Sequence, residues 1–515
     1  MRRRTWVEIA ALFLILTLAA YLRLANNADN PGWYSDEGTH LDIAQNLARG
    51  RTQYLAINQS TLLFSKLPLF ELLLAGLLRA TGGEIGALRT FTGALGVISV
   101  GTLYLVVRRI NKEPLLALLS ALMLAIYPQA ILYSRFGLSY NLLTPLVLLA
   151  FLGLWEYLDR IRRGWLALAA LAIGIGGVSD LWMFVLVAPM VLVVSIRRRR
   201  DLLWSIPLLL LPFGLYAAVM LLNAPQAFLF DLGFTASRLS RLSPAAQLTT
   251  LAFNYAIIVS QDHWIALAIA GMFLLRPARL QRLSLLMFLF PIIILGRTVA
   301  LFNLSFYYMI PLLPFVGLGM AAVIRRGVPH VARALQGALL SLFENWGWSP
   351  GRFLSIGVNL ILFAVVISPF LTSVVWSARQ THDGFSTEID PFLIDPGDAR
   401  QAAEYVNRQS DADDVIIASP ALAWLLRANV ADFQMTVAAT GQETPHLPAD
   451  IPVDRFAFDP DHRSARFVVV DNLWRNWGVW NVPGVSDIAR QVETWSLAFK
   501  AGEIEVYCNP VRPDC

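Results

Sequence analysis

Long apolar stretches, separated by short polar and basic segments, run from the N-terminus to residue 376. Most are close to the ~20 residues that an α-helix needs to cross the hydrocarbon core of a bilayer. The stretches are 6–24, 87–107, 114–133, 139–158, 164–179, 181–196, 202–222, 251–275, 283–300, 306–324 and 353–376. The pattern predicts a mostly α-helical polytopic membrane protein with about 11 transmembrane helices.

A shorter apolar run, from Leu67 to Leu78, is about 12 residues long and too short to cross a bilayer. It predicts an interfacial or re-entrant helix. If it does not cross, all basic clusters of the membrane region fall on the side of the N-terminus. These clusters are Arg2 to Arg4, Arg108 and Arg109, Arg160 with Arg162 and Arg163, Arg197 to Arg200, Arg276 with Arg279 and Arg282, and Arg325 with Arg326. Because basic loops stay in the cytoplasm, the N-terminus is predicted to be cytoplasmic and the C-terminus extracytoplasmic.

The N-terminus has three arginines followed by the apolar stretch 6–24. A cleaved signal peptide is the alternative, but it has a shorter apolar core and a small-residue cleavage site. The sequence favours an uncleaved first transmembrane helix.

The composition changes after residue 376, where charged residues and prolines become more frequent and no spanning run remains. Helical and strand patterns alternate there, which predicts a small extracytoplasmic α/β domain. The predicted elements are helix 397–409, strand 414–419, helix 421–428, strand 466–471 and a last edge strand 503–508. The segment has no glycine-rich phosphate loop, so a covering or acceptor-binding role is favoured over a catalytic one.

Four segments are therefore predicted. A transmembrane core, 1–325, includes a first extracytoplasmic loop, 25–86. A cytoplasmic loop, 326–352, and a last transmembrane helix, 353–376, follow. The extracytoplasmic α/β domain covers 380–515.

Composition supports a membrane protein and excludes some functions. Hydrophobic residues make up 56% of the 515-residue chain and charged residues 15%, and the mean hydropathy is +0.56. A soluble domain usually has about 25% charged residues. The net charge is +5, but the arginines cluster at the ends of apolar runs, which indicates orientation and not a nucleic-acid partner.

The two cysteines, Cys508 and Cys515, give no zinc or iron–sulfur pattern. On the extracytoplasmic side they could close a small disulfide loop. Two unpaired thiols are the alternative.

The main candidate chemistry is an acidic stretch, Trp33 to His40, directly after the first apolar run. It places the adjacent carboxylates of Asp36 and Glu37, with His40, just outside the membrane. Neighbouring residues on a helix point about 100° apart, so we expect Asp36 to face a substrate as a general base. Glu37 is expected to orient a partner or bind a metal. A solvated loop, or an N-cap from Ser35 or Asp36 on a helix over 39–49, is the alternative.

Three cations are candidates for binding a phosphate near the same membrane face. They are Lys66 before the short apolar run, Arg135 at the end of the third span, and Arg297 near the end of the span 283–300. An arginine can hold a phosphate through two parallel hydrogen bonds. Alternatively, Lys66 snorkels to lipid headgroups and Arg135 pairs with Asp36 for structural reasons.

Further candidates carry a weaker signal. Tyr307 and Tyr308 are typical of an aromatic belt at the membrane interface. Asp262 and His263 fall in the middle of the apolar stretch 251–275, where ionisable groups are costly. No spacing typical of metal ligands or of a Ser-His-Asp or Cys-His arrangement is present.

A carboxylate beside several cations at the membrane surface suits a lipid-phosphate-linked donor, whose phosphate leaves as the acceptor hydroxyl is deprotonated.

A series of short motifs carries a family resemblance. In chain order they are SDEGTHLDIAQNLARG from Ser35, KLPLFELLLAGLL from Lys66, GEIGALRTFTGALG from Gly83, YPQAILYSRFG from Tyr127 and YMIPLLPFVGLG from Tyr308. Together, over about residues 1–325, they resemble the membrane-embedded C-type glycosyltransferases. The nearest branch is that of protein O-mannosyltransferases and lipid A aminoarabinose transferases.

The resemblance implies a multi-pass enzyme of the cell membrane, with its active site on the extracytoplasmic side. It implies inverting transfer of a hexose or pentose from a polyprenyl-phosphate donor to a lipid, glycan or protein acceptor. Asp36 matches the family's catalytic base, and Lys66, Arg135 and Arg297 are the nearest matches to its phosphate-binding residues. Some members of the superfamily need a divalent cation, which leaves Mg²⁺ or Mn²⁺ open as a cofactor. The chain departs from the family at Lys66–Pro68, where a double proline is frequent, and at Ser179–Asp180, where a lysine is frequent.

Two other functions fit the same features. A lipid or solute transporter could use an outward-facing charged cavity, but would place its ionisable groups near the middle of the membrane. A non-catalytic scaffold that displays the α/β domain would not need Asp36.

Overall fold

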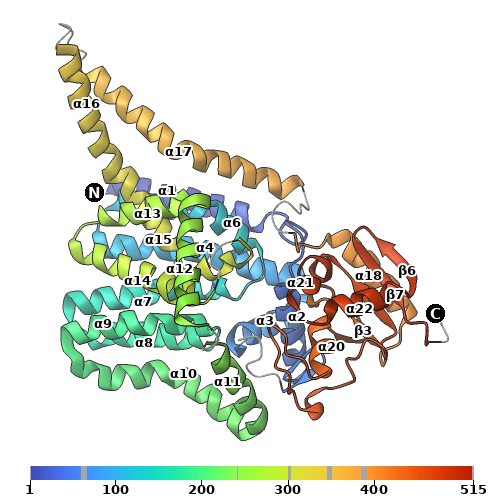
Figure 1. The fold of residues 1–515 in the computed structure, drawn as a ribbon. Coiled ribbons are helices and arrows are strands. Elements are labelled where there is room, and N and C mark those ends of the chain that lie inside the picture. Colours follow the sequence, from blue (N-terminus) through green and yellow to red (C-terminus); the bar gives the residue numbers. More distant parts are fainter. Residues whose placement is uncertain are drawn as a thin grey trace.

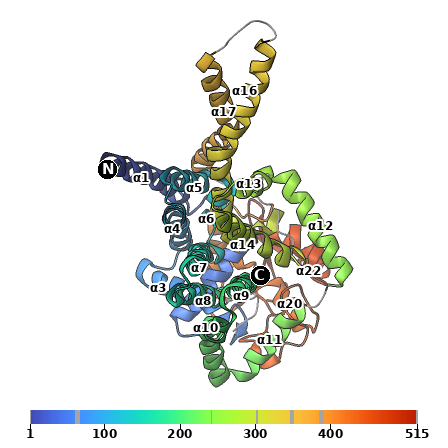
Figure 2. The same ribbon diagram turned by 90° about the vertical axis from the view of Figure 1, so that its left-hand side faces the viewer.

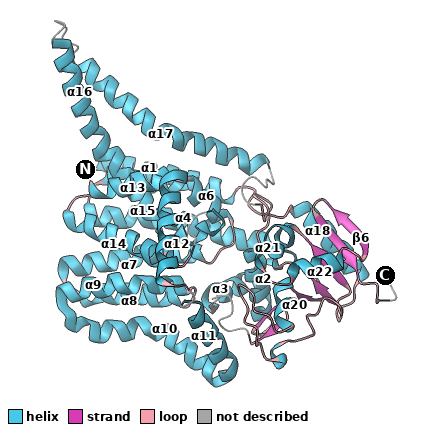
Figure 3. Cartoon of the chain, in the orientation of Figure 1, coloured by secondary structure: helices cyan, strands magenta, loops and turns pink. Residues whose placement is uncertain are grey.

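A computed structural model of the chain describes residues 2–59, 67–239, 242–299, 303–344, 351–383 and 391–512. A bundle of helices forms one part of the molecule, and a domain with a β-sheet lies against one end of this bundle (Figures 1 and 3). The mostly helical fold with a small C-terminal sheet domain confirms the predicted architecture.

Six helical stretches of the described residues are long and apolar enough to cross a membrane, and up to nine if each of three bent pairs is one span. The unbent stretches include α1 (Arg2–Leu24), α4 (Ile85–Asn111), α7 (Tyr140–Arg160) and α14 (Ala278–Gly296). Phe306–Leu339 covers most of η4 (Asn303–Leu312), α15 (Leu313–Ala322), η5 (Val323–Gly327) and α16 (Val328–Glu344). Leu181–Asn223 contains η2 (Leu181–Leu186), α9 (Val187–Arg198), η3 (Arg199–Asp201) and α10 (Leu202–Asn223).

The predicted number of about 11 spans exceeds this range for two reasons. Helix α8 (Arg163–Gly177) has only 15 residues, fewer than a straight span requires. The stretch Leu181–Asn223 counts as one span of 43 residues, where the sequence predicted two. Arg198 leaves helical geometry within it, with φ −160° and ψ 83°, at the predicted boundary between those two.

Three apolar stretches are bent. Helices α5 (Pro114–Ile126) and α6 (Pro128–Arg135) meet at 57°, because Pro128 cannot continue the hydrogen-bond ladder of α5. Helix α17 (Gly351–Asp383) bends by 46° between Ile356–Val365 and Phe370–Arg379.

The third bend corrects the predicted straight span 251–275. Helices α12 (Pro244–Gln261) and α13 (His263–Phe273) meet at 91°. The break falls at Asp262, whose carboxylate accepts a hydrogen bond from the Trp264 N–H and caps α13. The apolar composition of 251–275 gave no signal for a helix that starts at His263.

The predicted loop 326–352 contains helix α16, which continues from α15 through the π-helical turn η5. Helices α16 and α17 form a hairpin that projects from the bundle (Figures 1 and 2). Val331 and Leu335 lie one helical turn apart, and both are exposed. The charged residues and the Gly and Pro residues of this segment suggested a loop, although the apolar positions recur at helical spacing.

The segment predicted to be the first extracytoplasmic loop, 25–86, contains helices and a hairpin. It contains α2 (Ser35–Ala48), the hairpin strands β1 (Gln53–Tyr54) and β2 (Ile57–Asn58), and α3 (Pro68–Thr81). Helix α3 confirms the predicted short helix over 67–78. Its buried residues, which include Phe70, Glu71 and Leu74, lie on the side that packs against α2 and α4.

The C-terminal domain has a mixed five-stranded sheet in the order β4-β3-β5-β7-β6. Strands β4 (Asn429–Ala431), β3 (Val415–Ile417) and β5 (Phe467–Val470) are parallel, and β7 (Ile504–Cys508) and β6 (Ser496–Ala501) add antiparallel pairs. Its main helices are α18 (Pro396–Gln409), α19 (Pro420–Ala423), α20 (Phe433–Ala439) and α22 (Val485–Val492).

The predictions for β3, β5 and α18 are confirmed, and two others are wrong. Strand β7 is not an edge strand, because β6 pairs with its outer side. The predicted helix 421–428 ends at Ala423, and β4 follows. Strands β4 and β6 were not predicted from the sequence, because neither contains a long apolar run. Cys508 is disulfide-bonded, and Cys515 lies outside the described residues.

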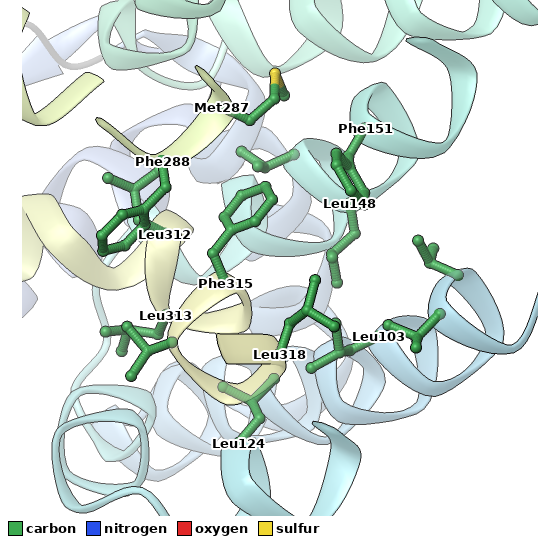
Figure 4. Close-up of a cluster of buried hydrophobic side chains, with 14 of the residues drawn as sticks. Leu103, Leu124, Leu148, Phe151, Met287, Phe288, Leu312, Leu313, Phe315 and Leu318 are labelled. Carbon is green, nitrogen blue, oxygen red and sulfur yellow. The ribbon is translucent and has the colours of Figure 1, made fainter. Parts of the chain in front are cut away.

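Two large hydrophobic cores hold the molecule together. One lies within the bundle, where Phe315 of α15 contacts the ring of Phe151 edge-to-face at 5.2 Å (Figure 4). The other joins residues of the first loop to residues of the C-terminal sheet domain in one continuous cluster. The C-terminal domain is therefore packed onto the first loop.

Candidate functional site

Asp36 lies in the first turn of α2, between the helical bundle and the C-terminal domain. The helix starts at Ser35 with Tyr34 as its N-cap, so the alternative that Ser35 or Asp36 caps a helix starting at Thr39 is wrong. The side chain of Asp36 is half-buried. Its charge acts on the hydroxyls of Tyr54, Tyr140 and Tyr307, so the carboxylate lies within electrostatic range of two bundle elements, α7 and η4.

Glu37, next to Asp36, is fully buried and held by four hydrogen bonds. Arg89 of α4 donates from Nε to Oε1 at 2.7 Å and from Nη2 to Oε2 at 2.6 Å. The backbone N–H groups of Tyr34 and Gly137 donate to Oε2 and Oε1 at 2.9 and 2.7 Å. Both carboxylate oxygens are therefore engaged, and Glu37 fixes the first turn of α2 against the bundle.

Arg89 was not predicted as a site residue, although it stands in the motif from Gly83. Its guanidinium also donates to the carbonyls of Asn27, at 3.0 Å, and of Gly32. An arginine within the first turns of a predicted span was a usable signal, because a buried cation requires partners.

An aromatic cluster surrounds this end of α2. Tyr140 stacks on Tyr307 at 5.3 Å, and Tyr307 contacts Tyr308 at 4.6 Å. Tyr34 contacts Phe136 at 5.8 Å. The cluster places apolar ring faces and several hydroxyl groups near the Asp36 carboxylate.

Two of the three predicted phosphate-binding cations, Arg135 and Arg297, lie in the described part of the chain. Arg135 is buried, and its Nη1 and Nη2 donate to the carbonyls of Leu22 and Asn26 at 3.0 Å. These bonds tie α6 to the end of α1, so most of its donors are in use. Lys66 lies outside the described residues.

Arg297 is half-buried at the C-terminus of α14 and makes one long hydrogen bond, from Nε to the Ile294 carbonyl at 3.5 Å. Among the residues that the structure describes it has no ion pair. The side-chain amide of Asn254 holds this helix end by donating to the Gly296 and Val299 carbonyls at 2.8 Å. Of the two cations that the structure describes, Arg297 has more available donors than Arg135.

The remaining candidates divide into two groups. His40 is buried, with Nδ1 2.7 Å from Oε1 of Glu71 on α3, so it links α2 to α3. Tyr307 and Tyr308 belong to the aromatic cluster. Asp262 instead accepts a hydrogen bond from the Tyr127 hydroxyl and joins the bend of α12 and α13 to that of α5 and α6, while the ring of His263 contacts Trp264.

Asp180, where the chain departs from the family pattern, lies near the aromatic cluster. Its charge acts on Tyr140, as that of Asp36 does. Its carboxylate also caps η2 by accepting from the Trp182 N–H at 2.8 Å. Trp182 Nε1 in turn donates to the Tyr308 carbonyl at 3.0 Å.

Buried carboxyl groups also lie where the first loop meets the C-terminal domain. Burial raises the pKa of Asp42 to about 6, and the same cause raises the pKa of Asp432 to about 6. Burial, with the charge of nearby Asp432 as a second cause, raises the pKa of Tyr54 well above its usual value. Tyr54 is hydrogen-bonded to the Thr39 hydroxyl at 3.2 Å.

The C-terminal domain contacts α2 directly. A Cβ atom on Gly38 would lie 1.8 Å from the Pro420 carbonyl oxygen of α19, so only glycine permits this approach. Trp33 forms a β-bridge with Ile394 and contacts the ring of Trp424 at 5.2 Å. The residues on both sides of Asp36 are thus held by the C-terminal domain.

No group of three or more His, Cys, Asp or Glu side chains in the described ranges could hold a metal ion. Because Glu37 is engaged by Arg89 and backbone N–H groups, it offers no free lone-pair direction for a cation in this arrangement. Mg²⁺ or Mn²⁺ stays an open alternative that comes from the family resemblance.

Comparison with known proteins bears on the class of this chain. Residues 65–223 match the family described as "Dolichyl-phosphate-mannose-protein mannosyltransferase". The match covers about a third of the chain, within the helical bundle. No curated protein sequence matches the chain.

Solved structures share the whole fold. ArnT from Cupriavidus metallidurans in the apo state has a TM-score of 0.62 at 14% identity, over 99% of this chain and 98% of that chain. The same protein bound to undecaprenyl phosphate has a TM-score of 0.60 at 14% identity, over 98% of each chain. The oligosaccharyltransferase AglB from Archaeoglobus fulgidus, with an inhibitory peptide and a dolichol-phosphate, has a TM-score of 0.56 at 13% identity, over 93% of this chain and 71% of that chain. The family match and these folds confirm the resemblance seen in the sequence.

Proposed function

We propose that this chain transfers a sugar from a polyprenyl-phosphate donor to an acceptor hydroxyl or phosphate on the extracytoplasmic face of the cell membrane. The observation that carries the proposal is the position of Asp36. Its half-buried carboxylate stands at the end of the bundle nearest the C-terminal domain, within electrostatic range of tyrosine hydroxyls, while Glu37 is fixed by Arg89.

The reaction is a single displacement with Asp36 as the general base. For a hydroxyl acceptor, the proton passes to the Asp36 carboxylate as the oxygen forms a bond to the anomeric carbon of the sugar. The bond from that carbon to the phosphate oxygen breaks, and the electron pair leaves with the polyprenyl phosphate. Attack opposite the leaving group inverts the anomeric centre.

Arg297 is the cation best suited to the leaving phosphate. Charge-assisted bonds from a guanidinium stabilise a phosphate as negative charge develops on it. Arg135 is assigned to holding the loop between α1 and α2, because its Nη atoms donate to backbone carbonyls there. Lys66 stays a candidate for the same phosphate.

Asp36 lies between the helical bundle and the C-terminal domain, and we expect each of these two regions to bind one of the two substrates. A polyprenyl tail is apolar and must stay in the bilayer, so the donor is expected on the side of the bundle. The acceptor is expected on the side of the C-terminal domain, which covers α2 through Gly38 and Trp33.

The test is sugar transfer from a panel of polyprenyl-phosphate sugars by the reconstituted full chain. A general base contributes roughly 10²- to 10⁴-fold to a rate, so Asp36→Asn is expected to lower kcat by this factor while the protein stays folded. Asp487→Asn is a matched control, since that carboxylate is exposed on α22 and pairs only with Arg490 among the described residues.

Unchanged kcat in Asp36→Asn would contradict the role of Asp36. Absence of transfer by the wild type from every donor would contradict the proposed activity.

A further inference from the structure

A buried ion pair joins the C-terminal domain to an outer helix of the membrane region. Arg455, at the end of η6 (Val453–Arg455), and Asp231, on α11 (Pro225–Leu239), lie 3.2 Å apart and are 5% and 0% exposed. Arg455 donates to Asp231 from both Nη atoms. Removing one partner of such a buried pair leaves a costly charge behind.

Arg455 also holds the hairpin of the first loop. Its Nε donates to the Asn58 carbonyl at 2.9 Å, and its Nη2 donates to the Gln59 carbonyl at 3.3 Å. Beside it, Phe456 forms a β-bridge with Ile57. One guanidinium therefore connects three chain segments that are far apart in the sequence: the hairpin, α11 and the C-terminal domain.

Helix α11 in turn covers the start of α3. Phe228 lies three residues before Asp231, on the same helical face, and is buried against Leu67, the N-cap of α3. Leu181, which follows Asp180, packs on the same cluster. A change in the position of α11 would therefore shift the start of α3 and η2, which lie on the bundle side of the site.

We infer that Arg455 is a positioning residue, through which the C-terminal domain holds α11 and the β1–β2 hairpin in place and so shapes the donor side of the site. The inference rests on the proposed function. Among the described residues Arg455 contacts neither Asp36 nor Arg297, so it acts through the elements it holds.

The variant Arg455→Lys keeps the charge but cannot reach three acceptors at once, because an ammonium lacks the planar fork of a guanidinium. We expect the KM for the lipid donor to rise roughly ten-fold, as the loss of one or two charge-assisted hydrogen bonds implies. The acceptor KM and kcat are expected to stay within about two-fold of the wild type. Binding of undecaprenyl phosphate alone to the purified full chain should weaken by the same factor as the donor.

Hydrogen exchange gives a readout that does not depend on activity. Arg455→Lys should speed exchange in both 225–239 and 53–59, while α18 stays protected. Asp231→Asn removes only the charge on α11, so faster exchange is expected in 225–239 alone. Arg463→Lys is the matched control, since Arg463 is an exposed arginine of the same domain, paired with Asp461.

The outcomes separate the two proposals. A wild type that neither transfers sugar nor binds undecaprenyl phosphate contradicts the proposed function. A wild type that does both, with Arg455→Lys unchanged in donor KM and in exchange, contradicts the positioning role. If Arg455→Lys does not fold, Asp231→Asn decides: unchanged exchange in α11 and an unchanged donor KM would overturn the inference.

Discussion

The Glu37 carboxylate and the Arg89 guanidinium meet through two parallel hydrogen bonds, with both side chains 0% exposed. Bidentate geometry of this kind fixes direction as well as distance. Since Glu37 is in the first turn of α2 and Arg89 is in the first turns of α4, the pair sets the angle between these helices. The direction in which the neighbouring Asp36 points follows from it.

Arg89→Met is expected to destabilise the protein by about 3–5 kcal/mol, because it leaves the Glu37 charge buried with two backbone donors. Sugar transfer should fall with it, as α2 loses its fixed first turn. Thermal unfolding followed by tryptophan fluorescence measures the first effect. Arg160→Met is the control, since Arg160 is 43% exposed and its ion pairs are 3.4 and 3.6 Å long; an exposed pair contributes about 0–1 kcal/mol. Equal losses in the two variants would contradict the role of the Glu37–Arg89 pair.

Gly38→Ala is expected to separate α2 from α19. The added Cβ would meet the Pro420 carbonyl at 1.8 Å, and a backbone group cannot turn aside as a flexible side chain does. Transfer and thermal stability should both decrease. Gly76→Ala, on the neighbouring helix α3, has open space around its Cβ and is expected to be neutral or to stabilise by up to about 1 kcal/mol through helix propensity. Equal transfer rates and equal thermal stability of Gly38→Ala and Gly76→Ala would contradict the close approach of α19 to α2.

The pKa of Asp432, about 6 in the folded protein, predicts a pH dependence of stability. An unfolded aspartate has a pKa near 3.9, so between about pH 4 and 6 the folded state binds more protons than the unfolded state. The contribution of Asp432 to stability is therefore largest below pH 4 and is lost as the pH rises to 6. Asp432→Asn, measured by unfolding midpoints over this range, should show a smaller decrease with pH than the wild type. Identical slopes would contradict the raised pKa.

Much of the bundle was predictable because apolar length and basic clusters are strong signals. Helices α1, α4, α7 and α14 begin and end within a few residues of the predicted spans. The bend at Asp262 and the helix α16 were not predictable from composition alone. In both places a polar or charged residue served as a cap or lay on one face of a helix, while the sequence average suggested a span or a loop.

The candidate site was predictable in its residue types but not in its pairings. Asp36 and Glu37 stood out as neighbours, yet nothing in the sequence shows that Glu37 meets Arg89, 52 residues later. The same holds for Arg455 and Asp231, which are 224 residues apart. Such pairs depend on how the outer segments pack against one another, and a single sequence contains no spacing rule for that.

The shared core of the first loop and the C-terminal domain has a consequence for biogenesis. Helix α2 leaves the ribosome early, but its partner α19 is made more than 370 residues later, after the last membrane helix. Until then the apolar residues of α2 and the hairpin that face the C-terminal domain have no covering surface, and an exposed surface of this kind favours aggregation. Protein synthesis that stops after residue 383 would therefore leave the helix that carries Asp36 without its cover from α19, so a segment translated after α17 completes the site that the first loop begins.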